Sequence, residues 1–493
     1  MLSRRIFLSG LLASTAPAAW AAAPERSLRP TVRPDDFLRR TVPEAADILE
    51  AANLSGRVGF AVADATTGEM LEVENPLYPL PPASVAKTVT SAYAMDRLGP
   101  NFRFRTRLVS DGVVADGRLD GDLWLVGSGD PLFDTDALAA MADALVTLGV
   151  QEVTGRFMVA TGALPEIWQI DPDQLPHVGY NPAISALNLN FNRVHFGWER
   201  VGEDYTISMD ARSASFRPAV QVARMRVEER SSPVYTYADA QSHDAWTVAR
   251  GALGEAGSRW LPVRRPAAYT ADVLQTLMEE HGVRLGAPEF AAEAPGAALV
   301  LAEHVSEPLE DILRGMMRWS TNLTAEVSGL LATQASGQEV TSLEESGAAM
   351  TAWMEETLGA RNAVFVDHSG LGVDSRIRPQ DMTHALVAAG PDGPLRGLMK
   401  DVPMRDPNGN VIQSHPVDVV GKTGTLSFVS ALTGFARTPS GRDLAFTIFC
   451  ADLDRRDAIP DAERERPPGA RTYNGAAKRL QQALIERWGV VYD

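Results

Sequence analysis

Residues 81–100 read PPASVAKTVTSAYAMDRLGP, and this stretch decides how the rest of the chain is interpreted. Apolar side chains at helical spacing predict a helix over 84–98, which Gly99-Pro100 would end. Ser84 and Lys87 are three residues apart, so on a helix the hydroxyl and the amine share a face. Such an amine can take the serine proton if burial or a second cation lowers its pKa. The pattern predicts a nucleophilic serine with a lysine base.

Two further short motifs carry groups suited to the same chemistry. Ser320-Thr321-Asn322 lies at a junction between helical stretches and can supply a second hydroxyl and an amide, although Ser and Asn are also favoured helix caps. Lys422-Thr423-Gly424 lies in an expected strand over 418–425, where Gly424 would let a ligand backbone approach. Lysine and threonine there would bind a carboxylate, although a lone motif of this kind is usually a turn.

The segments around these motifs predict one antiparallel sheet built from both ends of the chain. Segments that predict strands, because they are rich in strand-forming residues or are apolar and flanked by turn residues, occur near both ends of the chain. A helix with one apolar stripe follows the last of them. The expected strands are 58–62, 70–73, 418–425, 431–436 and 444–450, and the helix is 476–488. Helical texture over 268–281, 308–319 and 321–333 supplies a covering layer, so we expect an α/β (α+β) fold with a sheet flanked by helices.

Residues 101–266 have a different texture of short strands and turns, with Asp-Gly pairs at 111, 116 and 120. We expect them to form a large β-rich insertion of two nested subdomains that supplies no catalytic group. The catalytic domain would then consist of 22–100 and 267–493.

Charge and composition restrict the partners. The formal charge of −17 disfavours nucleic-acid binding through a general basic face. Only four of the 46 basic residues are lysines, namely Lys87, Lys400, Lys422 and Lys478. A guanidinium cannot serve as a base near neutral pH, so each lysine is a candidate for a position that needs an amine able to lose its proton. The single cysteine, Cys450, is expected to be a buried thiol.

Residues 1–21 predict a signal peptide, with Arg4 and Arg5 before an apolar stretch and Ala19-Trp20-Ala21 at the exit. The paired arginines resemble a twin-arginine export signal, and an ordinary secretory signal is the alternative. Both place the protein outside the cytoplasm, in the periplasm. We expect no stable membrane anchor, although the stripe of the last helix leaves membrane contact as an alternative to packing on the sheet.

Together, and in this order, the three motifs resemble those of penicillin-binding proteins and β-lactamases. The two motif serines are separated by 236 positions, and so large an interval resembles the class C low-molecular-mass penicillin-binding proteins, the D-Ala-D-Ala carboxypeptidase/endopeptidase family (peptidase family S13). Further stretches agree with that family: Gly127-Ser128-Gly129-Asp130-Pro131, Ser185-Ala186-Leu187-Asn188-Leu189-Asn190 and Asp367-His368-Ser369-Gly370-Leu371.

The resemblance implies the transpeptidase fold, peptidoglycan stem peptides as substrates, and β-lactams as covalent inhibitors. It implies Ser84, Lys87, Ser320 and Asn322 as catalytic residues, and Lys422, Thr423, Gly424 and Thr425 as substrate-binding residues. No metal or organic cofactor is expected. His368 is the histidine most suited to touch the cleft, with a structural role as the favoured alternative. A serine β-lactamase and a catalytically silent wall-binding protein on the same fold are the alternative functions.

Overall fold

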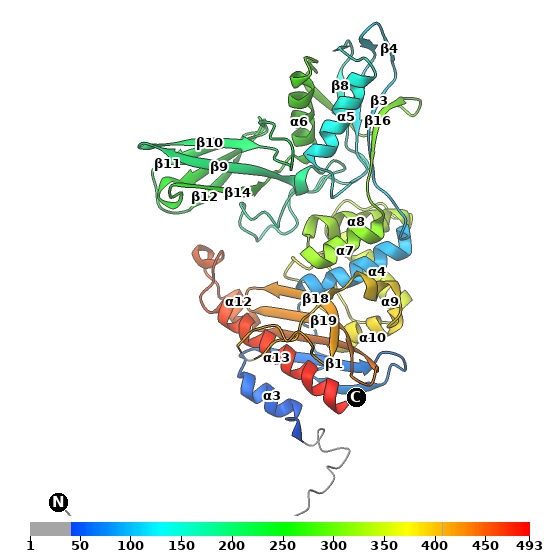
Figure 1. The fold of residues 1–493 in the computed structure, drawn as a ribbon, viewed down its shortest axis with the longest axis vertical. Helices are drawn as coiled ribbons and strands as arrows, with labels where there is room; N and C mark the ends of the chain where they lie inside the picture. The colour runs from blue at the N-terminus through cyan, green and yellow to red at the C-terminus, as the bar shows by residue number, and fades with distance from the viewer. Residues whose placement is uncertain (1–40, 407) are drawn as a thin grey trace, which may run out of the picture. The chain divides into compact units, whose positions relative to one another are not determined.

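The computed structural model describes residues 41–406 and 408–493, so the expected signal peptide lies outside the described residues. A six-stranded antiparallel sheet is the centre of the catalytic part (Figure 1). Its order is β17 (Lys400–Asp401), β18 (Asp418–Leu426), β19 (Val429–Arg437), β20 (Asp443–Ala451), β1 (Arg57–Asp64) and β2 (Met70–Glu74). The first and last parts of the chain meet because β1 pairs with β20, with Val62 opposite Phe446. The expected sheet is confirmed.

One face of this sheet is covered by α13 (Ala470–Val491) and α3 (Ala45–Ala52) (Figure 1). The apolar stripe of α13 is buried together with the sheet residues Phe60, Val62 and Phe446 in one cluster. Ala477, Leu480, Leu484 and Trp488 are all at most 2% exposed, so the stripe packs on the sheet and is not available to a membrane. No helix among the described residues is long and apolar enough to cross a membrane.

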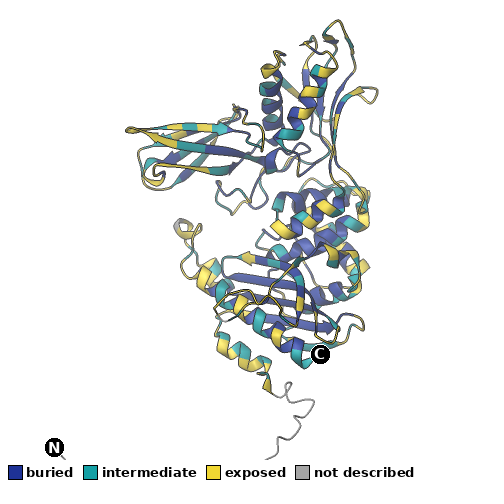
Figure 2. Ribbon diagram, viewed as in Figure 1, coloured by how far each residue is buried: buried dark blue, intermediate teal, exposed yellow. Residues whose placement is uncertain are grey.

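The opposite face carries the helical layer that holds the first two motifs. It contains the 3-10 turn η1 (Ala83–Val85) and the helices α4 (Ala86–Leu98), α7 (Leu309–Trp319), α8 (Asn322–Ala335), α9 (Leu343–Leu358), α10 (Pro379–Ala389) and α11 (Pro394–Leu398). The turn η1 packs against β18 and β19, while α10 packs against β1 and β20. These elements share one buried cluster, which makes the strands and inner helix faces dark blue in Figure 2. The N-terminus of α4 is thereby held against the third motif.

The inserted segment contains four small sheets and two long helices. A five-stranded sheet is ordered β15 (Pro288–Ala291), β8 (Phe157–Ala160), β6 (Leu123–Val126), β3 (Arg105–Ser110) and β16 (Leu299–Val305). The others are β10 (Asp204–Asp210)–β9 (Arg193–Val201)–β14 (Ala256–Pro262), β11 (Ala223–Glu228)–β13 (Asp244–Ala249)–β12 (Tyr235–Asp239) and β4 (Val113–Ala115)–β5 (Arg118–Asp120)–β7 (Glu152–Val153). The helices are α5 (Thr135–Thr147) and α6 (Pro266–Glu280).

Helix α6 and strand β16, which lie beyond the expected boundary at 266, pack or pair with the inserted strands. Tyr269, Leu274 and Met278 of α6 belong to the same buried cluster as the inserted strands. β16 pairs with β3, and the backbone N–H of Ser306 donates to the carbonyl of Phe104 where the two chain crossings meet. We therefore propose that the insertion runs from about 105 to about 305. The sequence had placed α6 in the helical layer because of its helical periodicity alone.

Candidate active site

The nucleophile motif lies where η1 passes into α4. Ser84 is in η1 and Lys87 is one turn later in α4, so their side chains meet. The Lys87 Nζ donates to Ser84 Oγ at 3.0 Å. Ser84 is partly exposed in the cleft, whereas Lys87 is fully buried. The structure therefore brings the hydroxyl and the amine together as the spacing predicted.

The Lys87 amine has two more partners, and neither is a carboxylate. It donates to Asn322 Oδ1 at 2.8 Å and to the carbonyl oxygen of Ser369 at 2.7 Å. Burial lowers the pKa of Lys87 to about 8, against an opposing effect of the buried carboxyls of Glu326 and Asp367. A lowered pKa makes the neutral amine accessible near physiological pH, which is the condition for a general base.

Glu326 is the residue of this site that the sequence did not reveal. It is fully buried on α8, and its two oxygens accept the backbone N–H groups of His368 and Ser369, both at 2.9 Å. Burial and the nearby Asp367 raise its pKa. Because Ser369 also supplies the carbonyl that Lys87 contacts, Glu326 fixes the loop that positions the amine. The only sequence signal for Glu326 was its position four residues after Asn322 on the same helix. Any helix has a residue at that position, so the spacing did not single it out.

The loop 367–372 is held by hydrogen bonds to Asp367 and lies against the residue before Ser84. Asp367 accepts the backbone N–H groups of Gly370 and Gly372, both at 2.6 Å. Gly370 has a φ of +73°, and a Cβ on it would lie 1.9 Å from the carbonyl oxygen of Ala83. Glycine is therefore required for the loop to reach the residue that precedes Ser84.

His368 lies in this loop but does not reach the cleft. Its ring is fully buried, with Nε2 2.8 Å from Ser346 Oγ and Nδ1 3.3 Å from Met350 Sδ. Burial lowers its pKa to about 3, so the imidazole is neutral. A Cβ on Gly329 would lie 2.1 Å from the ring, which shows how closely α8 approaches it. The structural alternative for His368 is the one that the geometry supports.

The second motif joins α7 to α8. Ser320 has a left-handed conformation, with a φ of 62°, that ends α7, and Asn322 begins α8. The Asn322 side chain caps nothing: its oxygen accepts from Lys87, and its Nδ2 donates to the carbonyl of Tyr180 in the insertion at 2.8 Å. The insertion therefore contacts this motif through the carbonyl of Tyr180, and Asn322 does not act as a helix cap.

The third motif lies on β18, opposite the other two. Lys422 is buried, and its Nζ donates to Ser320 Oγ at 2.9 Å and to the carbonyl of Thr423 at 2.6 Å. Burial, with Lys87 and Lys400 nearby, lowers its pKa well below the usual value. A Cβ on Gly424 would lie 2.8 Å from the carbonyl oxygen of Pro82. The backbone that comes close to Gly424 is thus the chain's own, and Thr425 is left exposed at the strand edge.

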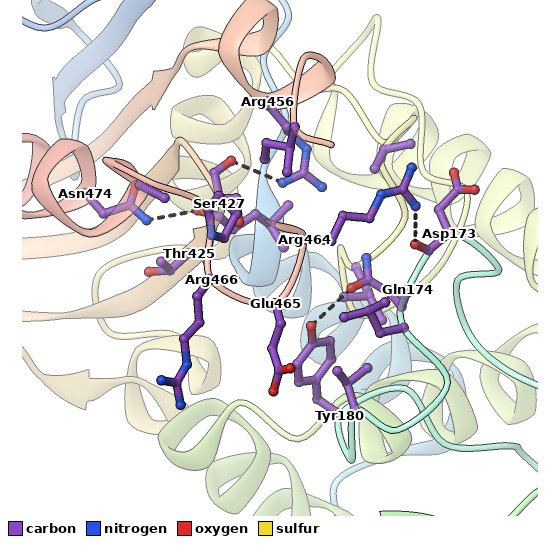
Figure 3. A pocket seen from close by; sticks show the side chains of 18 of the residues that line it. Asp173, Gln174, Tyr180, Thr425, Ser427, Arg456, Arg464, Glu465, Arg466 and Asn474 are labelled. Carbon is purple, nitrogen blue, oxygen red and sulfur yellow. Dashed lines mark hydrogen bonds between the residues drawn. The ribbon is translucent and has the colours of Figure 1, made fainter. Parts of the chain in front are cut away.

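A cleft of about 940 Å³ is lined by Ser84, Ser320, Asn322 and Thr425. Figure 3 shows Thr425 on one side of it, with Asp173, Gln174 and Tyr180 of the insertion also in its wall. Two segments outside the motifs also line it: residues 173–180 of the insertion and residues 456–474 after β20. The two segments touch, since Arg464 donates to the carbonyl of Asp173 at 2.9 Å and Glu465 Oε2 lies 3.4 Å from His177 Nε2. Neither lining segment was predicted, because charged loops carry no periodicity.

This arrangement places a serine hydroxyl beside a buried lysine amine, between a helical layer and strand β18 of an antiparallel sheet, as in serine enzymes that form an acyl intermediate. The similarity of the sequence to a known protein family agrees with this arrangement. Residues 43–465 match the model of the D-Ala-D-Ala carboxypeptidase 3 (S13) family, so the chain belongs to that family.

Its relatives and a solved structure extend the likeness over most of the chain. It is 24% identical to D-alanyl-D-alanine carboxypeptidase DacB of Haemophilus influenzae over 82% of this chain and 87% of the relative. It is 28% identical to the D-alanyl-D-alanine carboxypeptidase of an Actinomadura species over 87% of this chain and 86% of that relative. The crystal structure of penicillin binding protein 4 from Haemophilus influenzae superposes with a TM-score of 0.70 at 20% identity, covering 89% of this chain and 99% of that one. The penicillin-binding-protein fold expected from the motifs is confirmed.

Proposed function

We propose that the site is that of a serine D-Ala-D-Ala carboxypeptidase and endopeptidase, which cleaves peptidoglycan stem peptides through an acyl-enzyme. The observation that carries the proposal is the 3.0 Å contact between Lys87 Nζ and Ser84 Oγ, made by an amine with no hydrogen-bonded carboxylate. Ser84 attacks the carbonyl carbon of the D-Ala-D-Ala bond while neutral Lys87 accepts the serine proton. Family resemblance assigns the backbone N–H groups of Ser84 and Thr425 to the oxyanion.

The second half of the acylation step uses the other two motifs. Ser320, which contacts Lys422, relays a proton to the departing amine as the C–N bond breaks. Asn322 orients the acyl part of the substrate. Lys422, Thr423 and Thr425 hold the carboxylate of the leaving D-residue, with Gly424 allowing the strand to pack on η1. Water then hydrolyses the ester on Ser84, and the chemistry needs no metal or organic cofactor.

A β-lactam mimics the same bond, so we expect penicillin to acylate Ser84 and to remain attached. A β-lactamase would need a base that activates the deacylating water. Glu326 follows the second motif, yet both of its oxygens are occupied by backbone N–H groups in the interior. The geometry therefore favours a long-lived adduct over turnover.

The test is mass spectrometry of the intact protein after stoichiometric penicillin, combined with measurement of D-alanine released from a pentapeptide substrate. We expect one adduct on Ser84 and release of D-alanine. Rapid hydrolysis of many penicillin molecules without an adduct would favour the β-lactamase alternative. If no adduct forms and no D-alanine is released, the silent wall-binding protein is favoured.

We further propose that the protein works in the periplasm after export through the twin-arginine route. The proposal rests on the sequence of residues 1–21. Replacing Arg4 and Arg5 by lysine keeps the charge and should leave precursor in the cytoplasm, as measured by fractionation and immunoblotting. Unchanged export would point to the general secretory route.

A further inference from the structure

A second cavity, of about 720 Å³, adjoins the cleft on the other side of Thr425. Thr425 lines both spaces, and Thr423 and Gly424 also line the second. Its remaining walls come from β17 with the residues that follow it, from β19 and from α13. The cavity therefore begins at the strand edge where the proposed function places the leaving D-residue.

Four cations line this cavity: Lys400, Arg405, Lys478 and Arg479. In the described part of the chain, none of the four forms an ion pair with a carboxylate, and the two lysine amines have no hydrogen-bond partner. The protein carries a formal charge of −17. Four uncompensated cations in so acidic a chain indicate an anionic ligand.

The acids that share the cavity are Asp401, Asp406 and Glu486. Asp406 accepts the backbone N–H groups of Asn408 and Asn410, at 2.9 and 2.8 Å, and Glu486 lies 3.8 Å from His415. Two of the three acids are thus engaged with other groups, and the four cations exceed the three acids.

Lys400 connects this cavity to the reaction centre. It pairs across the sheet with Gly421, the residue before Lys422. Burial and Lys478 lower the pKa of Lys400, and Lys400 in turn contributes to the lowered pKa of Lys422. Two amines that repel each other are each stabilised by an anion placed between them.

The size of the cavity limits what the anion can be. Pockets that hold drug-sized ligands measure roughly 300–1,000 Å³. A cavity of about 720 Å³ is therefore far larger than a single departing D-alanine requires. A departing peptide with its own carboxylates matches both the volume and the charge.

We propose that the cavity lined by Lys400, Arg405, Lys478 and Arg479 is the subsite for the leaving strand of cross-linked substrates, where it binds a carboxylate-bearing stem peptide. The inference rests on the proposed function. In the reaction, Ser84 forms the ester with the donor strand, the bond to the amine of the second strand breaks, and that amine takes the proton relayed by Ser320. The released strand leaves from this cavity, and water enters to hydrolyse the ester.

The test compares two substrates in the full-length mature protein: an uncross-linked pentapeptide muropeptide and a cross-linked muropeptide dimer. The variant is Lys478→Gln with Arg479→Gln, two cavity cations on α13, and penicillin acylation reports whether the reaction centre is intact. The matched control is Arg284→Gln with Arg361→Gln, which removes two cations whose side chains are 89% and 77% exposed, away from the cavity. A third substrate, the dimer with its leaving-strand carboxylates amidated, separates charge from size.

We expect kcat/KM for the dimer to fall about tenfold or more in the variant, through KM, because two charge-assisted contacts are lost. The losses for D-alanine release and for penicillin acylation should be much smaller, and the control should behave as wild type. Amidation of the dimer should reduce the wild-type rate and remove most of the difference from the variant.

Equal losses for the dimer and the pentapeptide, or no loss for the dimer, would overturn the subsite. So would a wild-type protein that releases D-alanine but does not cleave the dimer. A wild-type protein that neither binds penicillin covalently nor releases D-alanine would instead overturn the proposed function on which the subsite rests.

Discussion

Replacing Lys87 by arginine separates the role of a base from the role of a cation. The Lys87 pKa of about 8 leaves roughly one amine in ten neutral at pH 7. An arginine at this position would stay protonated and be neutral in fewer than about one molecule in 10⁵ at pH 7. If the neutral form accepts the Ser84 proton, acylation by penicillin should fall by about 10⁴-fold in Lys87→Arg.

The rate of adduct formation is measured by mass spectrometry at several times after penicillin is added, with circular dichroism to verify that the variant folds. Lys422→Arg is the matched control, because we assign Lys422 only the role of a cation, and its loss should be milder. A Lys87→Arg variant that folds and is acylated at a near wild-type rate would refute the base assignment.

The same reasoning gives the sign of the pH dependence. Raising the pH through the Lys87 pKa of about 8 converts the ammonium to the neutral amine, so acylation should rise from pH 6 to pH 9. The rise should be about tenfold per pH unit on the acid side, because one proton is lost. A rate that stays flat over this range would mean that another group accepts the proton.

Three further substitutions test residues that position the site. Glu326→Gln leaves one buried backbone N–H without an acceptor, at a cost of about 1–3 kcal/mol, and should slow acylation as well as lower the melting temperature; unchanged acylation would contradict a positioning role. Gly370→Ala should reduce acylation at least about tenfold through its clash with the residue before the nucleophile, whereas Gly99→Ala, with a similar φ of +82° and open space around it, should not. Asp130→Ala removes a buried acceptor of a backbone N–H in the insertion, so it should lower stability by about 1–3 kcal/mol but leave adduct formation in place, and complete loss of acylation in a folded variant would be inconsistent with this assignment.

The sheet and the positions of the motifs follow from local sequence. Turn residues flank the apolar segments near both ends of the chain. The strands over 418–426, 429–437 and 443–451 lie within a few residues of the expected ones. Ser84 and Lys87 could be placed on one helix face because their spacing alone determines it. The contact of Lys422 with Ser320 required in addition that β18 and the α7–α8 junction meet, which only the family resemblance suggested.

Side chains that act from the interior could not be found in this way. Glu326 has the same local pattern as any helix residue, and its importance comes from backbone N–H groups 42 and 43 residues further along the chain. His368 was singled out because it stands in a family motif, but the direction of its ring depends on the space that Gly329 leaves. Both outcomes are set by tertiary contacts that periodicity does not encode.

The buried charges explain how a lysine can be both buried and basic here. Removing an ammonium from water is costly, and the nearby Glu326 and Asp367 offset part of that cost. Had either carboxylate bonded directly to the amine, it would have held the Lys87 pKa high and removed the base. Instead Glu326 and Asp367 accept hydrogen bonds from backbone N–H groups of the loop 367–372, and the amine contacts a hydroxyl, an amide and a carbonyl. The two carboxyl groups therefore offset part of the free-energy cost of burying the Lys87 ammonium and hold the loop in place. They do not raise the Lys87 pKa so far that the amine could no longer lose its proton.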